Sequence, residues 1–404
     1  MPLQGADEAS TLGDGLAAGD GPLTGDAILA AARALLPQIR AAADEIEQGR
    51  RLPLPLVQAM KDAGIFRMPM PRSWGGPEVD PVTQVKIVEA LSYADTSVGW
   101  CAMIGADGGY FSAFLDDSVG RALYSDLDLV TGSSTRPSGR AVATSGGYRV
   151  TGRWQFSSGC QHSAYLVGNC LVFDEAGQRF QEDGSPETRL CYMPAASCQI
   201  IDTWTTTGLR GSGSHDFAAD DVFVPAEHTF NTRTSPIQRD GPLYAWSFMF
   251  IVNGAGVPLG TARAAIDALL DLAASKQTLA GTGLRDEAWV RTAVARAETL
   301  VGGARGYVYD ALGEFWDVLL RGEVPSLRQR ARFRLTLAGA SELCVEAVDL
   351  MYRAAGGSSV YATNPLDRIF RDAHTVHQHI TNGPRVYEVA GQMLLGQEPG
   401  LAGW

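Results

Sequence analysis

Three of the six histidines of this chain stand close together near its C-terminus, at positions 374, 377 and 379. Imidazole changes its charge near neutral pH without help, so the cluster predicts proton chemistry. The spacings of three and two do not place these rings on one helix face, and no carboxylate motif accompanies them, so we expect no metal site. The cluster makes these three rings candidates for proton transfer or, alternatively, for a solvated or intersubunit helix face.

Composition narrows the class of protein. The 404 residues are 45% hydrophobic and 19% charged, which is ordinary for a globular chain with two or three subdomains. The net charge of −12 argues against nucleic-acid binding. We see no apolar run of membrane-spanning length and no secretion signal, so we expect a cytoplasmic protein with no membrane contact. The six cysteines show no CxxC pairing and are expected to be reduced.

The order of elements is helices, then strands, then helices. Residues 1–25 are rich in Gly, Ala, Asp and Ser and are expected to be a disordered tail. Apolar residues three and four apart predict an N-terminal α-helical domain over 26–126, including one buried helix from Ser97 to Phe114. Short β-rich runs cut by Gly, Pro and Asp predict a central β domain over 127–236. Helical periodicity then returns over 237–404. The expected long helices there are Val257–Lys276, Asp286–Arg321 and Ser326–Ala355.

Several motifs resemble the acyl-CoA dehydrogenase superfamily, in order and with sensible spacing over roughly 30–400. They are an Ala-Gly, Pro, Gly-Gly segment over 56–76, Trp-Gln-Phe-Ser-Ser-Gly at 154–159, Gly-Leu-Arg-Gly-Ser-Gly-Ser-His-Asp at 208–216, Gly-Gly-Ser-Ser at 356–359 and Arg-Asp-Ala-His at 371–374. The resemblance implies an α+β fold with an N-terminal helical domain, a central β-barrel-like domain and a C-terminal four-helix bundle. It also implies a homo-oligomer, usually a tetramer, with flavin bound between subunits.

The sequence is most similar to the flavin-dependent monooxygenase branch of that superfamily, of the p-hydroxyphenylacetate hydroxylase and dibenzothiophene monooxygenase type. The position of the dehydrogenases' catalytic glutamate, nine residues after Arg371, holds Ile380. The Gln that dehydrogenases place before the nucleotide loop is Arg353, which favours reduced FMN over FAD. The resemblance implies an oxygenase that uses reduced flavin and O2 on a small or polycyclic organic substrate. No GxGxxG fingerprint is present, so a separate flavin reductase is expected.

Two other functions stay open at this point. One is an FAD-dependent dehydrogenase or oxidase with a non-standard base, and the other is a non-catalytic flavin-binding or assembly protein. One departure bears on the substrate, because phenol hydroxylases of this group often carry a second histidine where this chain has Gly108. A larger pocket without an imidazole is expected there, with Asp107 as a replacement polar group.

The resemblance assigns roles to individual residues. It places Ser157 beside flavin N5 as a hydrogen-bond donor and Trp154 against the ring. It also makes His379, next to the position of the dehydrogenase glutamate, the catalytic acid or base, while His374 is expected to be structural. The other implied cofactor-binding residues are Ser133, Ser134, Ser158, Gly159, Arg210, Gly356, Gly357, Ser358 and Arg371. The implied substrate pocket contains Trp100, Asp107, Gly108, His162, His377 and Ile380. Structural alternatives remain: turn serines at 157 and 158, a core aromatic at 154, an ion pair at 210 and a helix C-cap at 356 and 357.

Overall fold

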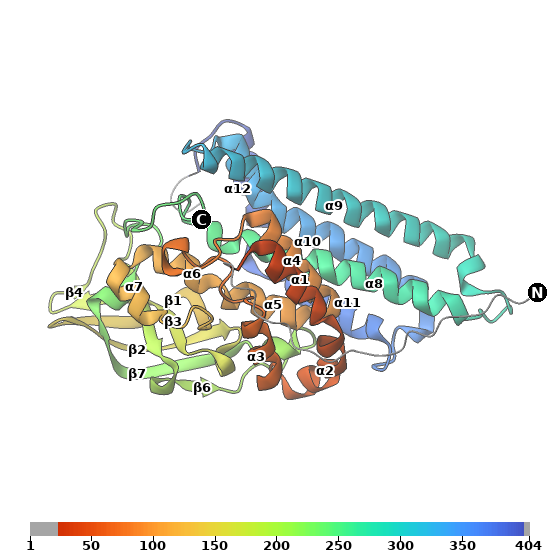
Figure 1. The fold of residues 1–404 in the computed structure, drawn as a ribbon, viewed down its shortest axis with the longest axis horizontal. Coiled ribbons are helices and arrows are strands. Elements are labelled where there is room, and N and C mark those ends of the chain that lie inside the picture. The colour runs from red at the N-terminus through yellow and green to blue at the C-terminus, as the bar shows by residue number, and fades with distance from the viewer. Residues whose placement is uncertain (1–22, 400–404) are drawn as a thin grey trace, which may run out of the picture.

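The computed structural model describes residues 23–399, and most of the predicted tail over 1–25 lies outside the described residues. Figure 1 shows a sheet at one end, a bundle of long helices at the other, and the N-terminal helices between them. Three clusters of buried apolar side chains correspond to these parts. The α, β, α order predicted from the sequence is therefore the order of the structure.

The N-terminal part is built from seven helices among the described residues. They are α1 Gly25–Ala34, α2 Leu36–Gly49, α3 Leu54–Asp62, α4 Pro81–Ala94, α5 Thr96–Gly105, α6 Asp107–Phe111 and α7 Asp117–Leu123. Local signals set their starts: Asp80 accepts from the Thr83 amide at 3.0 Å, and Asp95 accepts from the amides of Ser97 and Val98. The stretch 97–114 is buried as predicted but is not one helix. It is divided after Gly105 into α5, α6 and a 3-10 turn, in a run where several glycines weaken helix propensity.

The central part is one mixed sheet. Its strands are β1 Thr131–Thr144, β2 Gly147–Ser157, β3 Tyr165–Asp174, β4 Gly177–Gln178, β5 Thr188–Pro194, β6 Gln199–Ile201, β7 His215–Pro225 and β8 Thr229–Phe230. The order is β6-β7-β2-β1-β3-β5-β8, with β4 beside β3. Only β1 and β3 pair in parallel; the other described pairs are antiparallel. The sheet path ends on β6 and β8, so the barrel-like domain is an open sheet.

The C-terminal part is the helical bundle. Its helices are α8 Gly256–Ser275, α9 Ala288–Leu320, α10 Leu327–Ala355, α11 Pro365–His377 and α12 Pro384–Leu394. The three long helices predicted from periodicity are confirmed to within two residues at each end. A capping box between Ser326 and Gln329 starts α10. The stretch Met249–Ser275 is apolar enough to cross a membrane by length and composition, contrary to the sequence reading, but 78% of its most apolar window is buried in the bundle.

Candidate active site

The end of β2 carries the buried hydroxyl on which the site is built. The pairing of β2 with β7 shifts register between Trp154 and Ser157, and Phe156 within that bulge adopts a positive φ of 63°. The Ser157 side chain is fully buried, yet its Oγ finds no hydrogen-bond partner among the described residues. A buried unpaired hydroxyl costs roughly 1–3 kcal/mol. Strain next to an unsatisfied polar group is typical of a ligand-binding position.

The neighbouring serine is fully engaged by the protein. The Ser158 Oγ accepts a hydrogen bond from Trp100 Nε1 at 2.9 Å and shares another with Ser214 Oγ at 2.7 Å. Ser214 Oγ in turn lies 2.7 Å from Ser212 Oγ. This chain of buried hydroxyls ties helix α5 to the bulge in β2 and to the segment before β7. Ser158 therefore positions the loop, while Ser157 keeps its hydroxyl available.

His379 reaches the same place from the other end of the sequence. Its ring packs edge-on against Trp100, with 5.2 Å between centroids and 78° between planes. Burial lowers the pKa of His379 to about 4, so the ring is neutral at pH 7. Its Nδ1 accepts from the Thr381 backbone N–H at 3.5 Å and lies 2.8 Å from the Thr381 hydroxyl. Because an amide can only donate, the proton of the neutral ring sits on Nε2, which makes His379 a hydrogen-bond donor.

The other two histidines of the cluster point elsewhere. His374 Nε2 lies 2.9 Å from Asp349 Oδ1 on α10, and its ring packs on Phe370. His377 Nδ1 lies 3.0 Å from Ser341 Oγ, also on α10. These contacts agree with a structural role for His374, which stays a prediction. The contact with Ser341 places His377 against the bundle rather than beside Trp100, so the structure does not bring it to the predicted substrate pocket.

The surroundings of Gly108 differ from the prediction. A Cβ atom at this position would stand 2.6 Å from the Tyr124 ring and 2.8 Å from its hydroxyl, so Tyr124 fills the space where a larger pocket was expected. The Tyr124 hydroxyl lies 2.9 Å from that of Tyr192. Neighbouring Asp107 is buried, which raises its pKa well above the usual range, and accepts a long hydrogen bond of 3.5 Å from Ser133 Oγ. The predicted polar replacement at Asp107 is thus a buried carboxyl group whose pKa is raised by burial.

Trp154 belongs to the interior of the sheet. Its side chain has no exposed surface, stacks on Phe217 at 4.8 Å between centroids, and donates from Nε1 to the Asn169 carbonyl at 2.7 Å. Gly139 and Gly168 leave the room that the indole fills, since a Cβ at either would lie within 2.5 Å of it. The predicted contact of Trp154 with a flavin ring is therefore not available. The exposed aromatic of this strand is Phe156, which is 66% exposed.

His162 and the segment of β1 that carries Ser133 and Ser134 lie beside the bulge. His162 Nε2 is buried without a described partner, and burial lowers the pKa of the ring to about 4. A Cβ at Gly159 would stand 3.0 Å from that nitrogen, and one at Gly132 would stand 3.0 Å from Ser157 Oγ. Ser134 Oγ donates to the Gln155 carbonyl at 2.9 Å. The structure therefore brings Ser133, Ser134, Ser157, Ser158, Gly159, His162, Trp100 and His379 into one region, as the resemblance implied.

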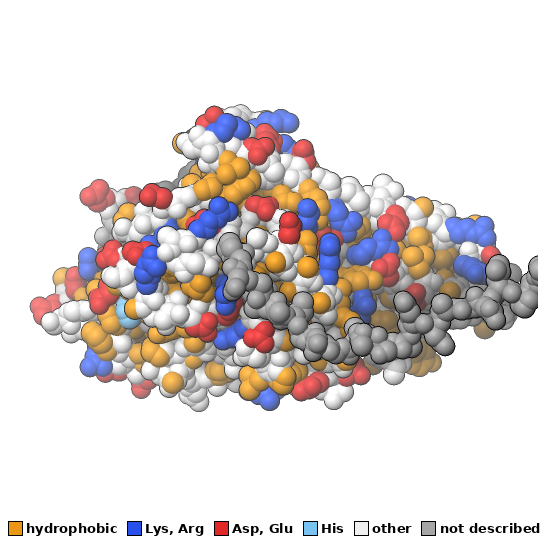
Figure 2. All heavy atoms as spheres, in the orientation of Figure 1, with side chains coloured by type: hydrophobic (Ala, Val, Ile, Leu, Met, Phe, Trp, Pro, Cys, Tyr) orange, Lys and Arg blue, Asp and Glu red, His pale blue; other side chains and the backbone are white. Residues whose placement is uncertain are grey.

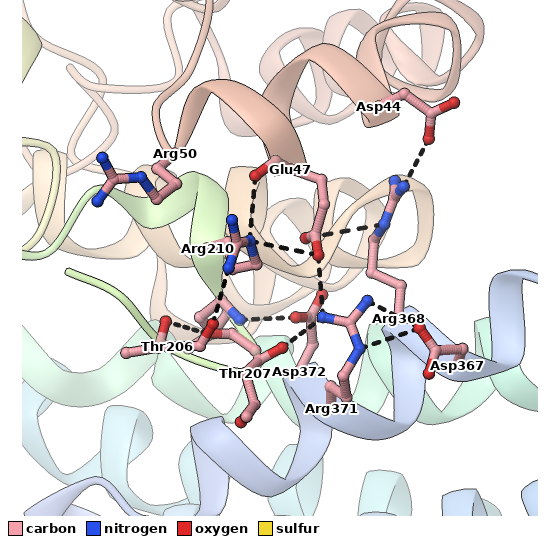
Figure 3. Close-up of polar contacts among 12 residues, drawn as sticks. Asp44, Glu47, Arg50, Thr206, Thr207, Arg210, Asp367, Arg368, Arg371 and Asp372 are labelled. Carbon is pink, nitrogen blue, oxygen red and sulfur yellow. Dashed lines mark hydrogen bonds and ion pairs between the residues drawn. The ribbon is translucent and has the colours of Figure 1, made fainter. Parts of the chain in front are cut away.

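Two predicted cofactor-binding arginines are instead committed to an ion-pair network. Figure 3 shows Arg210, Arg368 and Arg371 converging on Glu47. Arg371 pairs with Glu47 and with Asp367, both at 2.9 Å, and donates to the Thr207 carbonyl. The Arg210 Nε lies 3.6 Å from the Glu47 carboxylate and 3.3 Å from its carbonyl oxygen.

Because these contacts use the guanidinium donors, both arginines hold α2, the loop before β7 and α11 together. This network explains the Arg-Asp-Ala motif in structural terms. The Leu209 amide donates to Asp372 at 2.6 Å, and burial raises the pKa of that carboxyl well above its usual value. The predicted roles of Arg210 and Arg371 in cofactor binding therefore find no support within one chain.

Two further predicted positions lie away from this region. The 3-10 turn Gly356–Ser358 caps α10, and Lys276 Nζ, just after α8, donates to the Ala355 carbonyl beside it at 2.5 Å. Figure 1 places this end of the bundle far from the sheet. Ile380 is 85% exposed, so this position provides no buried base. The prediction that Ile380 lines a substrate pocket is not supported within one chain. Gly356, Gly357 and Ser358 could reach a flavin only from a second subunit.

The sequence reasoning missed Phe156, Tyr124 and Tyr192. The positive φ of Phe156 leaves no trace in residue type, and Tyr124 and Tyr192 meet across 68 residues of chain. His215 holds the segment after β6 against the start of β7, because its Nδ1 accepts from the amides of Thr203 and Trp204. Among the described residues no three His, Cys, Asp or Glu side chains form a metal-binding group.

The region fits a flavin. The unpaired buried hydroxyl of Ser157, the unpaired buried Nε2 of His162 and the exposed ring of Phe156 are groups that a planar heterocycle with ring nitrogens would engage. The neutral Nε2–H of His379 adds a donor that does not require a charge. These features describe a site for a planar, hydrogen-bonding ring system rather than for an acyl thioester with a carboxylate base.

Comparison with known proteins agrees with this geometry. The acyl-CoA dehydrogenase N-terminal domain matches residues 25–114, and the C-terminal domain matches residues 253–384. Indole-3-acetate monooxygenase of Pseudomonas putida is 30% identical over 89% of this chain and 91% of its own. The FADH2-dependent resorcinol hydroxylase oxygenase component of a Rhizobium species is 28% identical over 89% and 92%. The crystal structure of the HsaA monooxygenase from Mycobacterium tuberculosis superposes with a TM-score of 0.85, at 27% identity over 95% and 100% of the chains.

The chain therefore belongs to the acyl-CoA dehydrogenase superfamily. Within it, the chain is a flavin-dependent monooxygenase, which excludes the dehydrogenase and the non-catalytic alternatives.

Proposed function

We propose that this protein is the oxygenase component of a two-component system, which accepts reduced FMN from a separate reductase and uses O2 to oxygenate a small or polycyclic organic substrate. The observation that carries the proposal is the buried, unpartnered Ser157 hydroxyl at the strained end of β2, next to the Trp100–His379 pair. Reduced flavin, when bound, supplies the two electrons that activate O2.

The chain's own residues then have distinct tasks. Ser157 donates its hydroxyl to a ring nitrogen of the flavin, and Ser158 holds the loop through Trp100. His379 keeps its proton and donates an Nε2–H hydrogen bond to the reacting oxygen or to the substrate, which stabilises negative charge as it develops there. The apolar surroundings keep water away, and burial raises the pKa of Asp107, which disfavours a negative charge beside the reaction.

Assembly is the next part of the proposal. The C-terminal region leaves large apolar side chains uncovered, including Leu270, Trp289, Leu320, Val360 and Tyr361. On α9, a Cβ at Gly302, Gly303 or Gly306 would meet nothing within 4 Å, so another helix could approach closely. We infer a homotetramer, in which the Gly356–Ser358 turn of one subunit could approach the flavin of another.

We infer that the protein is located in the cytoplasm, because its six free cysteines suit a reducing compartment. Acidic and basic side chains are interspersed on the face in Figure 2 rather than gathered into one basic patch, and we infer no nucleic-acid partner. We also infer no membrane contact and no metal requirement.

The test supplies reduced FMN or FAD from an unrelated flavin reductase and NADH, and measures O2 uptake and oxygenated product with a panel of phenols, indoles and polycyclic aromatics. Product that depends on both the reductase and this protein is the expected result. Product formation from an acyl thioester with an artificial electron acceptor, and none with O2, would contradict the proposal.

A further inference from the structure

One buried carboxyl group differs from all the others that the structure describes. Six carboxyl side chains are buried among residues 23–399. Five of them have firm partners within the chain: arginines bind Asp128, Glu187 and Asp216, and backbone amides donate to Asp95 and Asp372. The sixth is Asp107 at the start of α6, which receives only the long hydrogen bond of 3.5 Å from Ser133 Oγ. Buried polar groups are normally well bonded, so this exception indicates a missing partner.

The tyrosines around Asp107 do not supply that partner. Tyr110, Tyr124 and Tyr192 lie within electrostatic reach of its carboxyl. However, the Tyr110 hydroxyl donates to Gln84 Oε1 at 2.9 Å, and the hydroxyls of Tyr124 and Tyr192 bond to each other at 2.9 Å. No arginine, lysine or histidine among the described residues pairs with Asp107, and burial raises the pKa of its carboxyl well above the usual range. The carboxyl therefore lacks both a strong donor and a compensating positive charge.

Asp107 lies beside the candidate active site. The Ser133 that donates to it follows Gly132 in β1, and a Cβ at Gly132 would stand 3.0 Å from Ser157 Oγ. Helix α6 also follows directly on α5, the helix that carries Trp100. A substrate held beside Ser157 and Trp100 is therefore the molecule that can complete the hydrogen bonding of this carboxyl.

A cation suits this carboxyl better than a neutral donor does. A hydroxyl would give one hydrogen bond but would leave the negative charge of a buried carboxylate uncompensated. A protonated nitrogen supplies both the hydrogen bond and the charge, and charge-assisted hydrogen bonds are about twice as strong as neutral ones. The chain itself pairs the buried carboxylates of Asp128, Glu187 and Asp216 with arginines. A carboxylate on the substrate would be repelled at the same place.

We propose that Asp107 determines substrate specificity: it pairs with a protonated nitrogen of the substrate and selects amines over neutral and acidic molecules of the same shape. The inference rests on the proposed function, because it takes the bound molecule to be the substrate of the oxygenase. It narrows the small or polycyclic organic substrate to one with a basic nitrogen, such as an amino group on a short side chain of an aromatic ring. Asp107 acts through binding and takes no part in the reaction of flavin with O2.

The test uses two series of molecules that share a ring and differ in charge. One series is tryptamine, 3-methylindole and indole-3-acetate, and the other is tyramine, p-cresol and 4-hydroxyphenylacetate. Each molecule is titrated without oxygen into the full-length protein saturated with reduced FMN, and calorimetry gives its dissociation constant. In at least one series, wild type should bind the amine at least about tenfold more tightly than the neutral molecule, and the acid most weakly. In Asp107→Asn, the amine and the neutral molecule should bind within about twofold of each other, because the amine loses its ion pair.

The matched control is Asp116→Asn. Asp116 is exposed just before α7, so its replacement removes the same charge outside the pocket, and the preference for the amine should persist. The Tm of Asp107→Asn should not fall, because Asp107 has no firm partner to lose. A carboxyl with a purely structural role would give the opposite pair of results, a lower Tm and an unchanged preference.

Two results would overturn the assignment of Asp107. One is wild type that shows no preference for the amine in either series, and the other is a preference that survives in Asp107→Asn. A different result would contradict the proposed function instead: no oxygenated product from any bound molecule when a reductase supplies reduced flavin in the presence of O2. Because binding is measured without oxygen, the preference for the amine and the failure of turnover can be told apart.

Discussion

The end of β2 and the Glu47 network carry motifs of the same family, yet they treat their polar groups in opposite ways. At the end of β2, Ser157 is buried with a hydroxyl that nothing in the described protein engages. In the network, Arg210 and Arg371 donate hydrogen bonds to Glu47, Asp367 and backbone carbonyls. A family motif can therefore mark either a ligand contact or a contact that holds structural elements together. The two are separated by whether the donors and acceptors of the motif are already bonded within the protein.

The largest expected effect is a loss of stability when the Glu47 network is broken. Glu47 faces three arginines, so Glu47→Ala leaves the partly buried Arg210 without a carboxylate and Arg371 with Asp367 alone. We expect the free energy of unfolding to fall by about 3 kcal/mol, the usual range for breaking a buried pair, with a lower Tm by calorimetry. Reduced flavin affinity of the folded variant should stay within a few-fold of wild type.

The control for Glu47 is Asp44. Asp44 pairs with Arg368 at 2.6 Å, but its own side chain is 84% exposed. Asp44→Ala should therefore cost no more than about 1 kcal/mol. Loss of flavin binding in Glu47→Ala at a temperature where it remains folded would show that the network belongs to the cofactor site after all.

The next effect is on turnover and sharpens the comparison between two histidines of one cluster. His379→Ala should lower turnover at least about tenfold with flavin binding retained, because it removes a neutral donor beside Trp100. Turnover of His374→Ala should stay within a few-fold of wild type, since that ring contacts Asp349 on α10. Steady-state kinetics with saturating reduced flavin measures both. A reversed order would reassign the proton chemistry to His374 or His162.

A smaller effect is expected in the pH dependence of stability. Burial lowers the pKa of His162 and His379 to about 4 from the ordinary 6.5, so both rings are neutral when folded and protonate readily when unfolded. Their contribution to stability is fully present above pH 6.5 and is lost as the pH falls from 6.5 to 4.

This contribution is measured by denaturant titration of wild type and His162→Gln across pH 4.5–7.5. The variant should lose less stability than wild type over that window. Buried Asp95, whose pKa burial raises to about 6, changes stability in the opposite direction and is common to both proteins, so the difference between them is the readout. Parallel curves would show that the His162 ring is not enclosed in solution.

Much of this architecture could be predicted from the sequence because local signals decide it. Periodicity gave α8, α9 and α10 to within two residues, and short β-rich runs cut by Gly, Pro and Asp indicated a β region between two helical regions. The break after Gly105 was missed because the stretch is apolar on every side and carries no period. The pairing of β1 with β3 shifts register between Ser134 and Gly139, and Pro137 inside this strand was the one sign of that irregularity in the sequence.

The site was predicted only in part, because residue type does not reveal what already occupies a side chain. Ser157 and Ser158 are identical and adjacent, and only the structure shows that Trp100 and Ser214 engage the second. Trp154 could not be told from a flavin contact until Phe217 was seen stacked on it. Tyr124 fills the space beside Gly108 from 16 positions away along the chain, a contact that no motif encodes.

The most direct test of the account compares Ser157→Ala with Ser158→Ala. The first removes a hydroxyl that the protein does not use, so Tm should not fall, while hydrogen peroxide released per O2 consumed should rise about tenfold. The second leaves Trp100 Nε1 unpaired, so the free energy of unfolding should fall by about 1–3 kcal/mol. Coupling of O2 use to product that is unchanged in Ser157→Ala, with a Tm that falls as it does in Ser158→Ala, would contradict the assignment of Ser157 to the flavin.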